Sequence, residues 1–404
     1  MSTMNVQTLK GFRDFLPDEA IKRNYLKDKI RQVFENWGYS PLETPTLEYL
    51  ELFAGQIGED EKLFFQFEDR GGRKVALRYD QTVPSCRVVG QYQNELTFPF
   101  KRYQIQSAFR AENPQKGRYR EFLQCDADIW GVPTSSADAE VIALSLAVYK
   151  EIGFPKVIAR INDRKLLADI PYVAIVALDK LQKSGKDGVI AEMVKRGIDQ
   201  SQAQIYFDQV INLKPNDTIK EIFETLENLG FSKDWYVFDP TIARSFAYSD
   251  GPIWEIEVPG YTAGSVLGGE RFDGLTLKVT GRDIPATGFA VGFDRTLEAA
   301  EQFGLLPETK SVSKILITVF SKELEQQSMK LCATLRSSHL NTEIYIGENA
   351  KMEKQLKYAD NKGIPFVAII GPEEVAKNVI VLKNMKTREQ KALTLDDVVK
   401  ILNT

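Results

Sequence analysis

The chain has 404 residues, a net charge of −4, 43% hydrophobic and 27% charged residues, which fits a globular protein of two or three domains. No apolar run approaches the roughly 20 residues of a membrane span, and three scattered cysteines without a CxxC pair argue against disulfides and structural zinc. The only histidine, His339, lies in a polar stretch, so Ser-His or Cys-His chemistry and a His-ligated metal are excluded.

The first part of the chain predicts a mixture of helices and strands. Residues 18–37 place apolar side chains at the three-to-four spacing of an amphipathic helix. A second helical period covers residues 137–152. Segments with the alternating character of strands are expected at residues 64–70, 74–80, 100–109, 122–130 and 156–163.

The stretch KRYQIQSAFRAENPQKGRYREFLQCDADIWG predicts a hairpin with a charged tip. Its first strand-like half ends on Arg110 and Glu112, a loop rich in cations follows, and Gln124, Asp126 and Asp128 come next at a spacing of two. Residues two apart in a strand share a face, so the last three side chains are expected to point the same way. Arginines at the tip and carboxylates along one face suit a polyphosphate beside a cationic small molecule. The alternative is a solvated hairpin on a sheet edge.

Residues from about 164 to 233 have mostly helical patterns, which predicts an inserted helical module. Strand-like segments return afterwards, and the last of them, residues 284–304, runs into a helix that carries Arg295 near its start. The polar segment LPETKSVS predicts a domain boundary. Beyond it, short strands alternate with helices, which predicts a small mixed sheet flanked by helices.

With histidine excluded, the chemistry must use arginine, lysine, carboxylates, backbone groups and Mg²⁺. This restriction favours phosphoryl or nucleotidyl transfer, in which positioning and charge neutralisation do most of the catalysis. The net charge of −4 still allows local basic patches to hold an RNA.

Several segments together resemble the class II aminoacyl-tRNA synthetases, and most closely their histidine-specific members. GFRDFLP resembles the N-terminal signature of these enzymes, and GYSPLETPTLE resembles motif 1, whose proline, here Pro45, lies at the dimer interface of the family. LRYDQT resembles the segment that holds the amino group of the amino acid. FRAENPQKGRYREFLQCDADIWG matches motif 2, GFAVGFDR resembles motif 3, and the C-terminal α/β region resembles an anticodon-binding domain.

The resemblance implies an α+β protein. Residues 1–305 are expected to form a catalytic domain, an antiparallel sheet with flanking helices and a helical insertion at about 164–233, and residues 313–404 an anticodon-binding-like α/β domain. The implied activity is ATP-dependent formation of histidyl-adenylate and transfer of histidine to the 3′ end of tRNA(His). The implied partners are histidine, ATP as its Mg²⁺ complex, tRNA(His) and a second copy of the chain, in the cytoplasm and without a membrane.

The same resemblance assigns roles to individual residues. Arg110 would clamp the α-phosphate, and Arg244 would be an additional catalytic arginine. Glu112 would hold the adenine amino group, and Arg118 and Arg295 would hold the γ-phosphate of a bent ATP. The residues expected around the amino acid are Asp80, Thr82 and Gln124 at its ammonium group, Asp128 at its imidazole, and Arg110, Arg244, Tyr248 and Ser249 nearby.

The segment RSFAYSDG departs from the usual histidine-reading loop of the family. Ala247 stands where aspartate is usual, and Ser249 stands where tyrosine is usual. Asp128 is one methylene shorter than the usual glutamate, and Glu270 and Phe272 replace the usual glycine and tyrosine. The groups that read the imidazole are thus altered, and a missing polar recognition group can cost much specificity. Tyr248, Asp250 or ordered water are possible replacements.

Two other functions are compatible with these departures. One is a histidine-sensing regulatory subunit of ATP phosphoribosyltransferase, a non-catalytic relative that shares the catalytic fold. The retained motif 2 and motif 3 arginines and the C-terminal domain argue against it. The other is an enzyme of the same class that activates a different amino acid. An ATP–pyrophosphate exchange assay across amino acids separates the three functions.

Overall fold

The computed structural model describes residues 6–55, 62–114, 117–244, 248–347 and 351–403. The chain folds into two compact units, one of residues up to 14 and 26–306 and the other of residues 15–25 and 307–404. Along the described residues, no helix combines the length and the apolar character needed to cross a bilayer.

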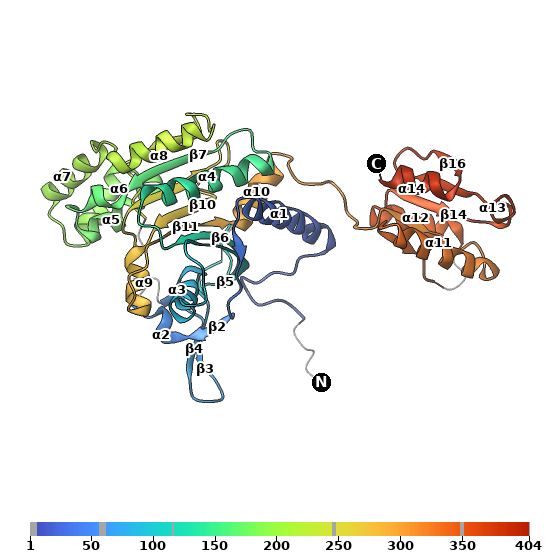
Figure 1. Cartoon of the computed structure of the whole chain (residues 1–404), viewed down its shortest axis with the longest axis horizontal. Coiled ribbons are helices and arrows are strands. Elements are labelled where there is room, and N and C mark those ends of the chain that lie inside the picture. The colour runs from blue at the N-terminus through green and yellow to red at the C-terminus, as the bar shows by residue number, and fades with distance from the viewer. Residues whose placement is uncertain (1–5, 56–61, 115–116, 245–247, 348–350, 404) are drawn as a thin grey trace. The chain divides into compact units, whose positions relative to one another are not determined.

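An eight-stranded sheet forms the centre of the first unit (Figure 1). Its strand order is β1-β5-β6-β11-β10-β9-β7-β8. The five inner pairings from β5 to β7 are antiparallel, and β1 and β8 pair in parallel at the two edges. The strands are β1 (Ser40–Pro41), β5 (Phe100–Phe109), β6 (Glu121–Trp130), β7 (Ile158–Asp163), β8 (Tyr236–Phe238), β9 (Pro252–Glu257), β10 (Leu267–Arg271) and β11 (Ala286–Gly292). The α+β fold class is confirmed.

One face of this sheet is apolar. The cross-strand row Tyr103, Ala127, Phe289, Gly269 and Trp254 lies on it, because directly paired residues share a face. Its side chains belong to the main core, together with buried residues of α4 (Ser135–Ile152), α8 (Asp217–Asn228), α10 (Phe293–Gln302) and the C-terminal part of α1 (Pro17–Asn36).

The opposite face is polar, and the register places three rows on it. The first row is Arg102, Asp128, Gly288 and Glu270. The second row is Gln104, Asp126, Ala290 and Gly268, and the third contains Gln106, Gln124 and Gly292. The structure therefore confirms that Gln124, Asp126 and Asp128 point to one side, as their spacing predicts. Small residues on β10 and β11 leave room above this face.

A small sheet and three helices form a second core in the same unit. The sheet has the order β2-β4-β3, with β2 (Leu47–Tyr49), β3 (Gln66–Glu68) and β4 (Lys74–Leu77). Its neighbours are α2 (Leu50–Phe53), α3 (Thr82–Gln91) and α9 (Asp273–Thr280). Tyr79, Trp130 and Phe272 are buried between these elements, and the Trp130 and Phe272 rings pack edge to face.

The helical insertion follows β7 and has a core of its own, with Ala174, Met193 and Phe207 buried. Its helices are η2 (Arg164–Leu167), α5 (Tyr172–Leu178), α6 (Leu181–Lys195), α7 (Gln200–Ile211) and α8. Side-chain caps start three of them, since Asp163, Asp199 and Asn216 accept backbone N–H groups of the first turns of η2, α7 and α8.

The hairpin differs from the sequence expectation in one respect. Arg110 and Glu112 were expected on the first strand, but β5 ends at Phe109. The Arg110 N–H still donates to the Arg120 carbonyl at 2.9 Å, whereas the Ala111 N–H donates to Leu63 at 2.8 Å. The chain therefore leaves the ladder at Ala111, and both side chains belong to the connecting loop.

The second unit contains a five-stranded mixed sheet of order β13-β12-β14-β15-β16. The first three strands are parallel, and β15 and β16 are antiparallel to their neighbours. The strands are β12 (Ile315–Ile317), β13 (Thr342–Ile344), β14 (Phe366–Ile369), β15 (Ile380–Asn384) and β16 (Gln390–Leu393). The helices after Pro307 are η3 (Lys322–Leu324), α11 (Glu325–Ser337), α12 (Met352–Lys362), α13 (Pro372–Lys377) and α14 (Leu395–Asn403).

Candidate active site

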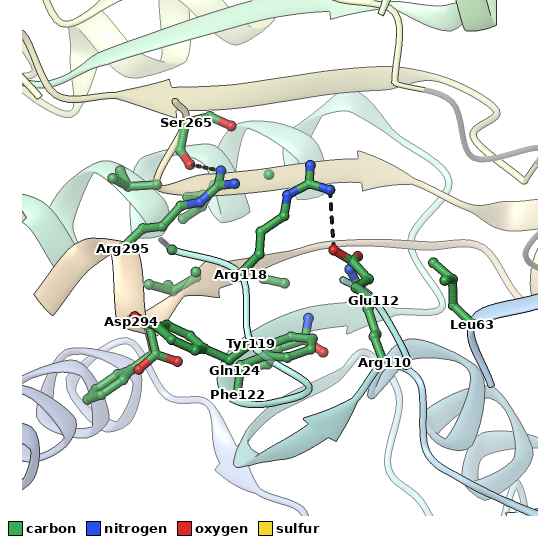
Figure 2. A pocket seen from close by; sticks show the side chains of 18 of the residues that line it. Leu63, Arg110, Glu112, Arg118, Tyr119, Phe122, Gln124, Ser265, Asp294 and Arg295 are labelled. Carbon is green, nitrogen blue, oxygen red and sulfur yellow. Dashed lines mark hydrogen bonds and ion pairs between the residues drawn. The ribbon is translucent and has the colours of Figure 1, made fainter. Parts of the chain in front are cut away.

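A cavity of about 770 Å³ lies on the polar face of the large sheet. Its floor includes Gln124 of β6, Ala290 and Gly292 of β11, and Gly268 of β10. The hairpin loop contributes Arg110, Glu112, Arg118 and Tyr119, and the start of α10 contributes Asp294 and Arg295 (Figure 2). Of the residues predicted from the sequence, Arg110, Glu112, Arg118, Gln124 and Arg295 line this cavity.

Two arginines converge at one end of the cavity. The Arg295 guanidinium donates to the Ser265 carbonyl at 2.9 Å, and Arg118 pairs with Glu112 at 3.3 Å (Figure 2). Burial lowers the pKa of Arg295, and the positive charge of Arg118 lowers it further. Two neighbouring cations that repel each other form a site for an anion, and planar guanidinium groups suit phosphate oxygens.

Arg110 lies at the other end of the loop. Its guanidinium carbon is 4.2 Å from the centroid of the Tyr79 ring and 5.0 Å from that of Phe122, and its Nε donates to the Tyr79 carbonyl at 3.3 Å. The rings and the carbonyl orient this side chain. Within the described residues Arg110 and Arg295 form no ion pair with a carboxylate, so their charge remains available to a ligand.

Of the three residues expected at the ammonium group, only Gln124 lines the cavity. Its side-chain oxygen is buried without a partner among the described residues. Asp80 is buried and accepts the Val83 N–H at 3.1 Å, so its carboxylate is bound to the first turn of α3, which begins at Thr82. Burial raises the pKa of Asp80 to about 6. Neither Asp80 nor Thr82 is among the residues that line the cavity.

Asp128 forms an ion pair with Arg102, its partner across the β5–β6 ladder, and does not line the cavity. Arg102 is fully buried and Asp128 is 2% exposed. Burial raises the pKa of Asp128 to about 6, although Arg102 opposes this shift. A Cβ atom at Gly288 would overlap the Asp128 carboxylate, so glycine is required between Asp128 and Glu270.

Glu270 connects two residues of the altered loop. Its carboxylate accepts from the Arg244 guanidinium at 3.2 Å and from the Ser249 hydroxyl. Arg244 adopts a φ of 40°, an uncommon conformation for a residue other than glycine, and also faces Glu255 at 3.8 Å. Its guanidinium lies over Gly268 of the cavity floor, where a Cβ atom would overlap it.

Tyr248 and Phe272 lie next to Glu270 and Ser249. The partly buried Tyr248 ring packs edge to face against Phe272, with centroids 6.5 Å apart. Ala247 lies outside the described residues. Glu270 was identified in the sequence only as a departure from the family pattern, and its contacts with Arg244 and Ser249 depend on the fold.

Sequence reasoning missed the contribution of the insertion to the cavity. Tyr172 and Val176 of α5, followed by Asp179, Lys180 and Arg196, line it together with the hairpin loop. Lys180 and Arg196, which flank α6, were only a weak sequence signal for a site, because cationic residues are common on solvated helices. Their place in the cavity follows from how the insertion folds back over the sheet.

A family model described as histidyl-tRNA synthetase matches residues 11–184 and 197–296. The chain belongs to the histidyl-tRNA synthetase family. A family model described as anticodon binding domain matches residues 314–404. The histidine–tRNA ligase of Cytophaga hutchinsonii is 34% identical over 96% of this chain and 98% of its own length. That of Aeropyrum pernix is 36% identical over 97% of this chain and 96% of its own length.

Solved structures agree with the family assignment. A crystal structure of histidyl-tRNA synthetase from Nostoc sp. superposes with a TM-score of 0.85 at 28% identity, over 99% of both chains. A Bacillus halodurans structure titled as an ATP phosphoribosyltransferase regulatory subunit/histidyl-tRNA synthetase has a TM-score of 0.70 over 89% of this chain and 97% of its own. Its identity of 22% shows the shared fold alone.

Proposed function

We propose that the chain is a histidine–tRNA ligase, which activates histidine with ATP to histidyl-adenylate and transfers histidine to the 3′ end of tRNA(His). The observation that carries this proposal is the cavity on the antiparallel sheet, which Arg110, Arg118 and Arg295 line together with Gln124. Membership of the histidyl-tRNA synthetase family supports it.

The chemistry needs no histidine in the protein. The carboxylate of the amino acid attacks the α-phosphorus of ATP and is already ionised near neutral pH, so no general base is required. The remaining requirement is stabilisation of the charge on the phosphorus centre. Arg110 is suited to the α-phosphate, because its guanidinium is oriented by Tyr79 and carries no competing ion pair among the described residues.

The other cavity groups fit the rest of a bent Mg²⁺–ATP complex. Arg118 and Arg295 form an anion site suited to the γ-phosphate, and Glu112 would accept from the adenine amino group. The Mg²⁺ ion arrives with ATP as part of the substrate.

The amino acid would lie beside Gln124, on the polar face of the sheet. Its ammonium group would meet Gln124, Asp80 and Thr82, and Arg244 would face the carboxylate and α-phosphate. Its imidazole would lie toward the remaining predicted residues, Asp128, Tyr248 and Ser249. Because Asp128 pairs with Arg102 and Ser249 donates to Glu270 in the structure, binding of histidine requires these side chains to rearrange.

The remaining parts of the proposal concern organisation and location. Residues 1–305 would form the catalytic domain, with an insertion at about 164–233, and residues 313–404 would contact the anticodon of tRNA(His). The enzyme would act in the cytoplasm as a homodimer, with Pro45 near the dimer interface.

ATP–pyrophosphate exchange measured with each of the twenty amino acids tests this function. Histidine should support exchange at least about 10²-fold better than any other amino acid, since a site built on buried polar groups rejects ligands that leave them unpaired. Strong exchange with another amino acid would show a different specificity. Histidine binding without any exchange would favour the regulatory subunit.

Replacing Glu270 with glutamine tests its role next to Arg244. The variant keeps the size of the side chain and removes the charge that holds Arg244, leaving Glu255 at 3.8 Å as its acidic neighbour. We expect kcat for histidine-dependent exchange to fall about tenfold with little change in the KM for ATP, because small displacements of a positioned group are costly. Glu257→Gln is the matched control, since Glu257 pairs with Arg160 instead. Unchanged kcat in Glu270→Gln would show that Glu270 does not position Arg244.

A further inference from the structure

A short N-terminal segment, residues 10–13, is attached to the hairpin loop. The Arg120 N–H donates to the Gly11 carbonyl at 2.9 Å, and the Arg120 guanidinium donates to the Lys10 carbonyl at 3.3 Å. Gly11 has a φ of +90°, and a Cβ atom there would lie 2.7 Å from Arg120 and 2.9 Å from Pro114. Only glycine allows so close an approach, so this segment lies directly against the loop.

Arg13 extends from this segment to two elements that line the cavity. Its Nη2 lies 2.9 Å from the Asp294 carboxylate in the first turn of α10. Its guanidinium carbon is 3.2 Å from the centroid of the Tyr119 ring in the hairpin loop. Asp294 is 7% exposed, so water screens this ion pair only partly. One guanidinium thus contacts both elements, and Figure 2 shows Tyr119 and Asp294 close together in the cavity wall.

The two elements that Arg13 joins carry charges that repel each other. Arg118 precedes Tyr119 in the loop, and Arg295 follows Asp294 in α10. Burial and then the positive charge of Arg118 lower the pKa of Arg295, and nearby groups that include Glu112 offset only part of this effect, so the approach of the two cations is unfavourable without a further anion. The contacts of Arg13 with Asp294 and Tyr119 favour the joined arrangement of the loop and α10 against this repulsion.

We propose that Arg13 is a positioning residue for ATP: it ties the hairpin loop to α10 through Tyr119 and Asp294, so that Arg118 and Arg295 are already converged when the phosphates bind. The inference rests on the proposed function, because it assigns the anion site to the nucleotide. A preorganised site binds its ligand more tightly, because fewer side chains and loops have to lose conformational freedom on binding. Arg13 itself is not among the residues that line the cavity, so it would act through Tyr119 and Asp294.

Titration calorimetry of the full chain with Mg²⁺–ATP, without any amino acid, tests this proposal. Arg13→Ala should raise the Kd for ATP about tenfold. Arg13→Lys keeps a cation for Asp294 and loses the planar stack on Tyr119, so it should raise the Kd about threefold. Arg31→Ala is the matched control, because it removes an arginine that pairs with an aspartate on the exposed surface, and its Kd should equal that of the unchanged protein.

Exchange kinetics and thermal unfolding separate positioning from a purely structural role. Arg13→Ala should raise the KM for ATP by the same factor as the Kd and leave the KM for histidine within about twofold. An unchanged Kd for ATP, with or without a fall in Tm, would overturn the proposal, as would equal increases in both KM values. If Arg13→Ala does not fold, Arg13→Lys decides by the same criteria. Calorimetry needs no amino acid, so a failure of histidine specificity leaves this test intact.

Discussion

Replacing Arg110 or Arg295 with alanine is expected to lower histidine-dependent ATP–pyrophosphate exchange by about 10²–10³-fold, the usual loss when one preorganised donor to developing charge is removed. Both guanidinium groups line the cavity, and neither forms an ion pair with a carboxylate among the described residues. Their removal therefore leaves no buried acid without a partner, and the fold should be preserved.

The two variants should differ in which kinetic constant changes. Arg110→Ala should mainly lower kcat, because the α-phosphate gains charge in the transition state, whereas Arg295→Ala should also raise the KM for ATP. Arg73→Ala serves as the control, since Arg73 is an exposed arginine that pairs with Asp69 on the β3–β4 hairpin. Exchange within about threefold of the unchanged protein in either variant would remove that arginine from the mechanism.

Replacing Asp128 with alanine is expected to destabilise the first unit by about 3–5 kcal/mol, the usual cost of removing one partner of a buried ion pair. Arg102 is fully buried, and its guanidinium would lose its paired carboxylate. The chain has four tryptophans, at positions 37, 130, 235 and 254, all in the first unit, so the urea midpoint of tryptophan fluorescence measures this effect. Asp28→Ala, which removes an exposed ion pair with Arg31, should leave the midpoint nearly unchanged.

The same variant tests recognition of the amino acid. If Asp128 also pairs with the imidazole, Asp128→Ala should raise the KM for histidine strongly and leave the KM for ATP nearly unchanged. Asp128→Asn keeps the shape of the side chain and separates the loss of charge from the loss of packing. An unchanged KM for histidine in protein that is still folded would assign Asp128 to the structure alone, as the partner of Arg102.

The sequence alone determined those features that depend on local patterns. Alternation at a spacing of two places Gln124, Asp126 and Asp128 on one face of β6, and the register of the sheet agrees. The helical period of residues 137–152 and the alternating α/β pattern after Pro307 correspond to observed elements. The family was recognised from several short motifs in the right order, from GFRDFLP through motif 3 to the C-terminal α/β region, because each motif keeps particular residues at a fixed spacing over a short stretch of chain.

The tertiary structure alone decided which charged groups pair with each other and which of the expected site residues lie outside the cavity. Asp128 pairs with Arg102 because the β5–β6 ladder places the two opposite each other, and neither residue's local sequence contains that register. Glu270 reaches both Arg244 and Ser249, and Arg13 reaches Asp294, 281 residues away in sequence. Periodicity reports the face on which a side chain lies, whereas its partner depends on strand order, register and loop path, which are set by burial of the whole core.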